Sequence, residues 1–113
     1  MDFRFTSEQQ ELQKKLTEFA QDKIAPIATE WEESNNVRWD FIKILAENDI
    51  LRYVVPKEHG GFGINSTNVC IIREELARIC YKADESFICQ GLGSYPITCY
   101  GTESQKKKYL PPV

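Results

Sequence analysis

The sequence contains no run of about 18 consecutive apolar residues, the length at which a hydrophobic stretch becomes a candidate membrane-spanning helix. Its first residues, MDFRFTSEQQ, also lack the basic flank and apolar segment of a secretory signal peptide. No internal repeat, low-complexity tract or linker interrupts the chain. We therefore expect no membrane partner, and 113 residues fit a single domain with one core.

Charge of one sign is not in strong excess, since 14 Lys and Arg face 17 Asp and Glu for a formal net charge of −3. The one basic cluster, Lys106 to Lys108, is short and fits a solvated helix face, so we expect no nucleic acid as a partner. Because His59 is the sole imidazole, the chain alone cannot form a multi-histidine metal site, and we interpret His59 as a turn residue and not as a catalytic one. Glu74 and Glu75 are adjacent on a predicted helix, so they indicate a solvated or salt-bridged face and not a converging acid-base pair.

The four cysteines, Cys70, Cys80, Cys89 and Cys99, form no Cys-x-x-Cys pair. Their spacings of ten, nine and ten residues prevent consecutive cysteines from sharing one helix face. A cysteine-based metal or redox domain is therefore the weakest interpretation. We expect no metal and four buried free thiols in a reducing cytoplasm.

What the sequence does contain is helical periodicity. Thr6 and Gln9 have the spacing of a capping box, which predicts a helix start, and Leu12, Leu16 and Phe19 open an apolar stripe with steps of three and four. Because proline disfavours helical geometry in the residue before it but suits the first turn of a helix, we expect one helix to end near Lys23 and a second to begin near Pro26.

The same periodicity predicts further helices after a polar break at residues 34–36. A third helix carries the stripe Trp39, Ile42, Leu45, Ala46 and Ile50. The passage LRYVVP that follows is rich in β-formers but short, so we expect an extended link. A fourth helix is capped by Ser66 or Thr67 and carries the stripe Val69, Ile72, Leu76, Ile79 and Cys80.

A fifth helix is predicted to begin with Asp84 as its cap, and Gly91, Gly93 and Pro96 predict a kink or close packing within it. Gly101 fits a left-handed helix stop, and the capping box TESQ predicts a short last helix. Amphipathic helices joined by short connections can bury their stripes only against each other. The fold class is therefore all-α, an orthogonal or up-down bundle of five to six helices.

The passage VPKEHGGFGIN, residues 55–65, interrupts this pattern with three glycines. They form neither the dinucleotide fingerprint G-x-G-x-x-G nor a P-loop. Since glycine has access to positive φ, the Gly-Gly pair predicts a chain reversal with close backbone approach, and we expect His59 to hydrogen-bond locally in that turn.

Four passages, taken in order and spacing, carry a resemblance: FTSEQQELQKKLTEFAQDKIAPIATEWEE, VPKEHGGFG, REELAR and YGTESQKKKYLPP. They closely resemble the N-terminal domain of the acyl-CoA dehydrogenases, from about Phe5 to the last residue. The glycine passage resembles the family turn Pro-Glu-x-Tyr-Gly-Gly-x-Gly, with His59 at the usual tyrosine, and is expected to set the crossing of the third and fourth helices.

The resemblance implies a fold and a reaction. Family members have a helical N-terminal domain, a middle β-domain and a C-terminal helical domain, usually as a tetramer, and remove two hydrogens from the α and β carbons of an acyl-CoA thioester. FAD takes the hydride, a glutamate of the C-terminal domain takes the proton, and an electron-transferring flavoprotein receives the electrons. We expect residues 1–113 to be that N-terminal domain as a fragment, with the other two domains absent, inactive alone and without bound FAD.

The resemblance also points to substrate-binding residues. Ile88, Cys89 and Leu92 match the part of the family that lines the acyl pocket, and Ile88 with Gln90 could shape that cavity. The alternative is that they are ordinary core residues. For the whole chain, the alternative is a free-standing helical protein-interaction module derived from such a domain.

Overall fold

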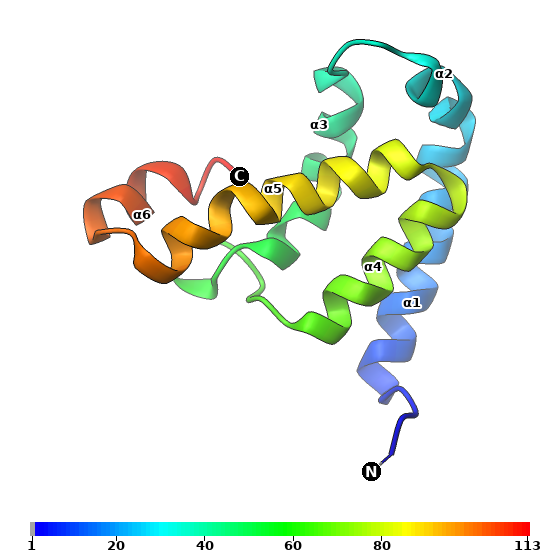
Figure 1. Cartoon of the computed structure of the whole chain (residues 1–113). Coiled ribbons are helices and arrows are strands. Elements are labelled where there is room, and N and C mark those ends of the chain that lie inside the picture. Colours follow the sequence, from blue (N-terminus) through cyan, green and yellow to red (C-terminus); the bar gives the residue numbers. More distant parts are fainter. Residues whose placement is uncertain (1) are drawn as a thin grey trace.

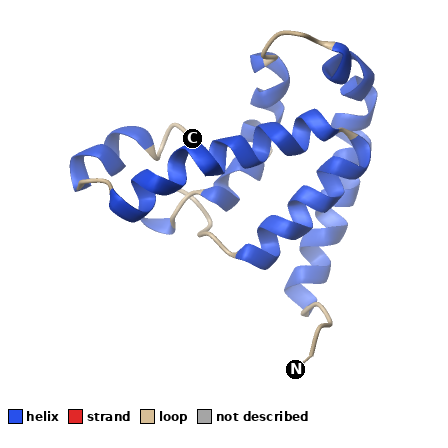
Figure 2. Cartoon of the chain, in the orientation of Figure 1, coloured by secondary structure: helices blue, strands red, loops and turns tan. Residues whose placement is uncertain are grey.

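The computed structural model describes residues 2–113, and these residues form helices and connecting loops with no strand among them (Figure 2). The all-α prediction is confirmed. The α-helices are α1 (Ser7–Phe19), α2 (Ala28–Glu33), α3 (Trp39–Glu47), α4 (Ser66–Ile79), α5 (Tyr81–Tyr100) and α6 (Glu103–Tyr109). A π-helix, Ala20–Ile24, and three 3₁₀ helices, Ala25–Ile27, Ile50–Val54 and Lys57–His59, lie between them.

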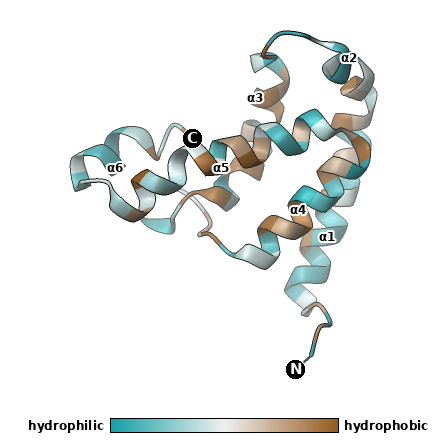
Figure 3. Ribbon diagram, in the orientation of Figure 1, coloured by the Kyte–Doolittle hydropathy of each residue, from teal (hydrophilic) through white to brown (hydrophobic). Residues whose placement is uncertain are grey.

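The arrangement is built on two neighbouring helices that run in the same direction, α1 and α4, with α5 crossing beside α4 (Figure 1). Helix α6 packs on the far end of α5 and extends away from the α1–α4 pair. Brown apolar segments gather where α3, α4 and α5 face the interior, and α6 is mostly pale or teal (Figure 3). One cluster of buried residues therefore holds the first five α-helices together.

The start of α1 confirms the predicted capping box. The Gln9 backbone N–H donates to Thr6 Oγ1 at 3.2 Å, and the Thr6 backbone N–H donates to Gln9 Oε1 at 2.8 Å. The predicted stripe is buried at Leu12, Leu16 and Phe19. These residues face α4. The capping box therefore sets where α1 starts, and contact with α4 buries its apolar stripe.

Pro26 does not separate two helices as predicted. The π-helix Ala20–Ile24 and the 3₁₀ helix Ala25–Ile27 carry the chain from α1 into α2 without an extended break. Pro26 lies in the first turn of that 3₁₀ helix, where its missing N–H would have had no partner. The π-helix before Pro26 and the 3₁₀ helix that contains it accommodate the proline, so the helical path is continuous.

The structure buries only part of the stripe predicted for the third helix. Leu45 and Ile50 are buried and Ile42 is half-buried, but Trp39 is 68% exposed, and Phe41, which was not in the predicted stripe, is buried instead. Phe41 packs against Trp31 with ring centroids 5.5 Å apart, and the Arg38 guanidinium lies 3.8 Å from the Phe41 ring centroid. In a helix of only nine residues, these contacts decide the buried face more than the wider periodicity does.

The passage LRYVVP was predicted to be extended, and this is wrong. Residues Ile50–Val54 form a 3₁₀ helix that packs against α5 and α3. Leu51, Val54 and Val55 are buried, so core packing overrides the β-preference of these side chains. Asp49 enters this helix with φ +64°, a left-handed conformation that asparagine and aspartate tolerate.

The glycine passage makes the predicted reversal. Gly60 and Gly63 have φ of +93° and +89°, and a Cβ on Gly61 would collide with the carbonyl of Val55. Close approach at Gly61 and positive φ at its neighbours therefore explain the three glycines. The predicted local hydrogen bond is present only on the His59 backbone, whose N–H donates to the Pro56 carbonyl at 3.1 Å.

The predicted helix ends in the second half of the chain are shifted. Asn65, one residue before the predicted pair, caps α4 by accepting from the Asn68 N–H at 3.0 Å. Helix α5 begins at Tyr81, so Asp84 is not its cap and instead binds Arg73 at 2.8 and 3.1 Å. Gly101 has φ −69° and no left-handed stop, but an added Cβ would lie 2.6 Å from the Ile97 carbonyl oxygen.

Two further features complete the fold. The second predicted capping box is confirmed, because Thr102 Oγ1 accepts from the Gln105 N–H at 3.2 Å and Gln105 Oε1 accepts from the Thr102 N–H at 2.9 Å. Glu75 is salt-bridged as predicted but is buried, with Arg78 at 3.2 Å and the Thr17 hydroxyl at 3.0 Å. Its ion pair and hydrogen bond satisfy a carboxylate that would be costly to bury alone.

The cysteines are free thiols, but three of the four are not buried. Only Cys80 is in the core, and Cys70, Cys89 and Cys99 are exposed. Within residues 2–113, no group of three or more His, Cys, Asp or Glu side chains is placed to hold a metal ion. None of the helices described is both long enough and apolar enough to cross a membrane.

Candidate functional site

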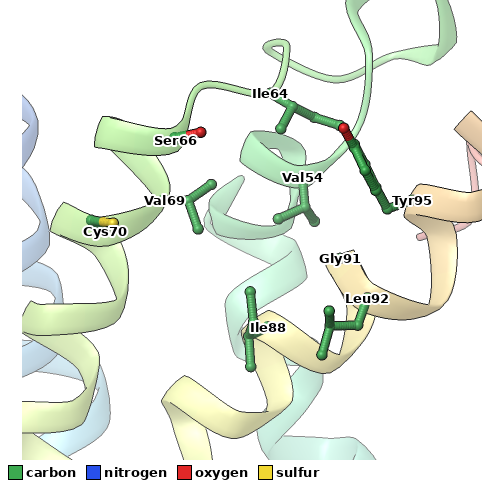
Figure 4. Close-up of a pocket in the computed structure, with 9 residues that line it drawn as sticks. All are labelled: Val54, Ile64, Ser66, Val69, Cys70, Ile88, Gly91, Leu92 and Tyr95. Carbon is green, nitrogen blue, oxygen red and sulfur yellow. The ribbon is translucent and has the colours of Figure 1, made fainter. Parts of the chain in front are cut away.

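A cleft of about 260 Å³ opens between α4, residues 88–95 of α5 and the 3₁₀ helix Ile50–Val54 (Figure 4). We call it the α4–α5 cleft. It is lined by Val54, Ile64, Ser66, Val69, Cys70, Ile88, Gly91, Leu92 and Tyr95. Three segments distant in the sequence therefore build one apolar hollow that opens to solvent.

Helix α5 provides one wall through side chains at helical spacing. Ile88, Leu92 and Tyr95 lie four and three residues apart, which places them on one face of the helix. Ile88 is half-buried, whereas Leu92 is 65% exposed and Tyr95 is 53% exposed. The wall thus begins in the core and ends at the surface.

Gly91 sets how closely α5 approaches Val54, which forms the floor of the cleft. A Cβ built on Gly91 would lie 3.0 Å from Val54 Cγ1, which is tighter than ordinary packing. Val54 is itself buried and held by the core. Glycine at position 91 therefore lets α5 lie directly on Val54, and this close packing is the one predicted for the fifth helix.

Helix α4 and the loop before it provide the opposite wall. Ser66, Val69 and Cys70 lie three and one residues apart on the first turns of α4, and Ile64 precedes them in the loop. The Asn65 cap fixes where α4 starts, and this start positions the side chains that form the wall. Figure 4 shows Val69 and Ile88 projecting from the two helices into the space between them.

The chemistry of the lining is apolar and uncharged. Its only side-chain heteroatoms are the Ser66 hydroxyl, the Cys70 thiol and the Tyr95 phenol. The hydrogen bond with the Cys99 thiol raises the pKa of Tyr95 above its usual range, so this phenol, which is neutral at ordinary pH, becomes still harder to ionise. The cleft can hold an apolar group and exclude water from it, but it presents no general base.

FAD does not fit this cleft. Its lining contains no cationic side chain for a diphosphate, and the glycine passage has no dinucleotide fingerprint. No step of flavin chemistry is therefore assigned to residues 2–113.

The structure places two of the three sequence-predicted site residues in the cleft. Ile88 and Leu92 line it, and the exposure of Leu92 rules out a core role for that residue. Cys89 is exposed but is not part of the lining, because it lies about 100° around the helix from Ile88. Gln90 likewise does not line the cleft.

Sequence reasoning missed the opposite wall and the floor. Val69 was predicted only as part of a core stripe, and nothing marked Val54, Ile64, Ser66 or Cys70 as site residues. A contact between residue 54 and residue 91 depends on the path of the intervening chain, so local periodicity carries no signal for it.

Comparison with known proteins gives concordant matches. Residues 6–113 match the family model described as the acyl-CoA dehydrogenase N-terminal domain. Glutaryl-CoA dehydrogenase of Desulfococcus multivorans is 34% identical over 98% of this chain and 30% of its own length. The short-chain specific acyl-CoA dehydrogenase of Clostridium acetobutylicum is 31% identical over 100% of this chain and 30% of its own length.

A solved structure agrees with these matches. It is described as "Electron transferring flavoprotein of Acidaminococcus fermentans: Towards a mechanism of flavin-based electron bifurcation". The similar chain in it has a TM-score of 0.82 and 30% identity, covering 100% of this chain and 30% of that one. The present chain thus spans about 30% of the length of the proteins it matches.

Proposed function

The chain belongs to the acyl-CoA dehydrogenase family as its N-terminal domain, and we propose from this that it serves an FAD-dependent acyl-CoA dehydrogenase whose acyl pocket has the α4–α5 cleft as one wall. The observation that carries the proposal is the cleft itself. It is apolar, uncharged and open, and it lies where the family resemblance put the acyl-pocket residues, at Ile88 and Leu92.

The proposed reaction divides the work between this chain and the rest of the enzyme. FAD, held outside this cleft, would supply the acceptor for the hydride of the β carbon, and a base outside residues 1–113 would take the α proton. The α proton is weakly acidic, so the acyl group must be held in one orientation while both hydrogens leave. The cleft supports that task by gripping the acyl chain and keeping water away from it.

Exposed apolar side chains support a second role, contact with neighbouring domains or subunits. Leu92 is 65% exposed, Tyr95 is 53% exposed and Tyr100 is 89% exposed, all on the second half of α5. Tyr109 on α6 is 48% exposed. Several large apolar side chains left exposed on two helices that contact each other, α5 and α6, support an interface. Residues 1–113 would then be one domain of a larger homo-oligomeric, cytoplasmic enzyme that passes electrons to an electron-transferring flavoprotein.

The alternative of a free-standing interaction module is not favoured. Two relatives that match 98% and 100% of this chain are named as dehydrogenases, and the family model that matches residues 6–113 describes this domain.

A domain exchange tests the proposal. Residues 1–113 would replace the matched segment of the Clostridium acetobutylicum acyl-CoA dehydrogenase, and the purified chimera would be mixed with butyryl-CoA and an artificial electron acceptor. We expect a yellow, flavin-loaded protein with turnover within about 100-fold of the parent enzyme, the range that an ångström-scale misplacement costs. A flavin-loaded chimera with no turnover would contradict the proposal.

Two variants of the chimera control for trivial effects. Leu92→Trp should fill the cleft and lower kcat/KM by about tenfold or more. Val37→Trp adds similar bulk at a side chain of matched exposure, 63% against 65%, far from the cleft lining, and should leave kcat/KM unchanged. The isolated 113-residue chain, tested in parallel, should be colourless and inactive.

A further inference from the structure

The side chains that line the α4–α5 cleft determine which acyl groups it can accept. This inference rests on the proposed function, in which the cleft binds the acyl group. Acyl-CoA substrates differ at the end of the acyl chain farthest from the thioester: some end in a methyl or aryl group, and others, such as glutaryl, end in a carboxylate. The relatives include dehydrogenases named for each of these two kinds, short-chain acyl and glutaryl. The cleft of this chain favours one of them.

None of the described residues that line the cleft has a charge. The hydrogen-bonding side chains there are Ser66, Cys70 and Tyr95, and none of them supplies a cation to pair with a carboxylate. The remaining lining is aliphatic or glycine. A carboxylate moved from water into such a lining loses its hydration and gains no counter-ion.

The nearest basic side chains on the flanking elements already have partners. Arg73, three residues after Cys70 on α4, donates to both carboxylate oxygens of Asp84. Arg52, two residues before Val54, donates to Asp49 Oδ1 at 2.7 Å and to the Gly60 carbonyl at 2.6 Å. Releasing either arginine to serve the cleft would break a charge-assisted contact.

The Lys57 side chain lines a hollow other than the α4–α5 cleft. Its aliphatic stem lies along Gly63, with Cε 3.5 Å from the position of a glycine Cβ. The hollow that Lys57 lines also contains Glu58 and shares only Ile64 with the α4–α5 cleft. A carboxylate near this lysine would therefore also meet the charge of Glu58.

We infer that this domain selects acyl groups with an uncharged, apolar distal end and rejects dicarboxylic acyl groups such as glutaryl. The specificity comes from the absence of a cation on both walls and on the floor of the cleft. Ile88 is the position with the greatest influence, because it is the half-buried member of the α5 wall, where a charge on the ligand would be least hydrated.

Methyl NMR on the 113-residue chain tests this directly. Two thioesters of N-acetylcysteamine with the same five-carbon acyl length, S-pentanoyl and S-glutaryl, would be titrated into protein labelled at Ile, Leu and Val methyl groups. We expect S-pentanoyl to shift Val54, Val69 and Ile88, with Leu16 in the core as the unshifted reference. S-Glutaryl should bind about tenfold more weakly or worse.

Two further titrations separate charge from size. The methyl ester of the S-glutaryl probe is longer but neutral, and it should bind as S-pentanoyl does. Ile88→Lys, checked for folding by the dispersion of its methyl spectrum, should narrow the gap between the S-pentanoyl and S-glutaryl probes by about tenfold.

The outcomes distinguish the two proposals. Equal binding of S-pentanoyl and S-glutaryl, with shifts at the cleft methyls, would overturn the inference on specificity and leave the acyl cleft intact. If neither probe nor the ester shifts the cleft methyls, the acyl cleft itself is wrong and the inference is overturned with it.

Discussion

The two halves of α5 are parts of one continuous helix with opposite surroundings. In the first half, Ala83 and Phe87 are fully buried and face the core. In the second half, Leu92 is 65% exposed and Tyr100 is 89% exposed. The first half holds the bundle together, whereas the second half presents apolar side chains to the cleft and to the surface.

The composition of the two halves differs in the same way. The second half contains Gly91, Gly93 and Pro96, which are the residue types least suited to a helix interior. Pro96 leaves the Leu92 carbonyl without its usual N–H donor, and the buried Ser94 hydroxyl donates back to the Gln90 carbonyl at 2.8 Å. Gly91 has a packing reason on Val54, but the remaining weak helix formers lie among exposed apolar groups, so this half of α5 serves a surface as well as the fold.

The largest effect should come from truncating the core residue of the first half. Phe87→Ala removes a fully buried ring and should lower the free energy of unfolding by about 3 to 5 kcal/mol, measured by urea denaturation. Leu92→Ala, five residues later on the same helix, should change it by no more than about 0.5 kcal/mol. Similar losses of unfolding free energy in both variants would show that the two halves of α5 do not differ in their contribution to stability.

A smaller effect should distinguish two glycines of the second half. Gly93 has no atom within 4 Å of an added Cβ, so Gly93→Ala should stabilise the chain by about 0.5 to 1 kcal/mol through helix propensity. Gly91→Ala should instead destabilise it by about 1 kcal/mol, because the new methyl crowds Val54. Thermal and urea unfolding of the two variants measure the difference, and a stabilised Gly91→Ala would show that α5 does not need to lie on Val54.

The smallest effect concerns Cys80, a buried residue at the N-cap position of α5 whose side chain makes no capping hydrogen bond. Burial raises the pKa of the Cys80 thiol, so the folded chain keeps a proton that the unfolded chain has released. Stability should therefore fall as the pH rises from the pKa of the unfolded thiol through that of the folded one. Cys80→Ala should flatten this alkaline decline in unfolding free energy, and an unchanged slope would rule out Cys80 as its source.

The accessibility of the thiols also distinguishes the buried start of α5 from its exposed positions. Cys89 and Cys99 lie on exposed positions of α5, and Cys80 is buried. In native protein, a disulfide reagent should label Cys89 and Cys99 promptly and Cys80 only on unfolding, as peptide mass spectrometry would report. Prompt labelling of Cys80 would mean that the start of α5 opens readily.

Features encoded within a few residues could be predicted from the sequence. The capping boxes at Thr6 and Thr102 are confirmed because each is a reciprocal pair of hydrogen bonds three residues apart. The Gly60–Gly61 reversal is confirmed for the same reason, since its requirements are local backbone geometry and close approach. The all-helical class followed from apolar periodicity.

Features that depend on distant packing could not be predicted. Trp39 and Phe41 both suit an apolar helix face, and only the position of Trp31 decides that Phe41 is buried. The β-formers of Ile50–Val54 become a 3₁₀ helix because α3 and α5 cover them. In the site, helical spacing linked Ile88 to Leu92, but the floor at Val54 comes from another part of the chain.

The central claim is that the acyl group lies against the α4–α5 cleft, and photolabelling tests it most directly. An acyl-CoA with a diazirine at the distal end of its acyl chain would be irradiated with the chimera, with and without excess butyryl-CoA, and the adducts mapped by peptide mass spectrometry. We predict competed adducts within residues 64–70 and 88–95, which contain eight of the nine cleft-lining residues. Competed adducts confined to other parts of residues 1–113, or none in this domain, would contradict the account.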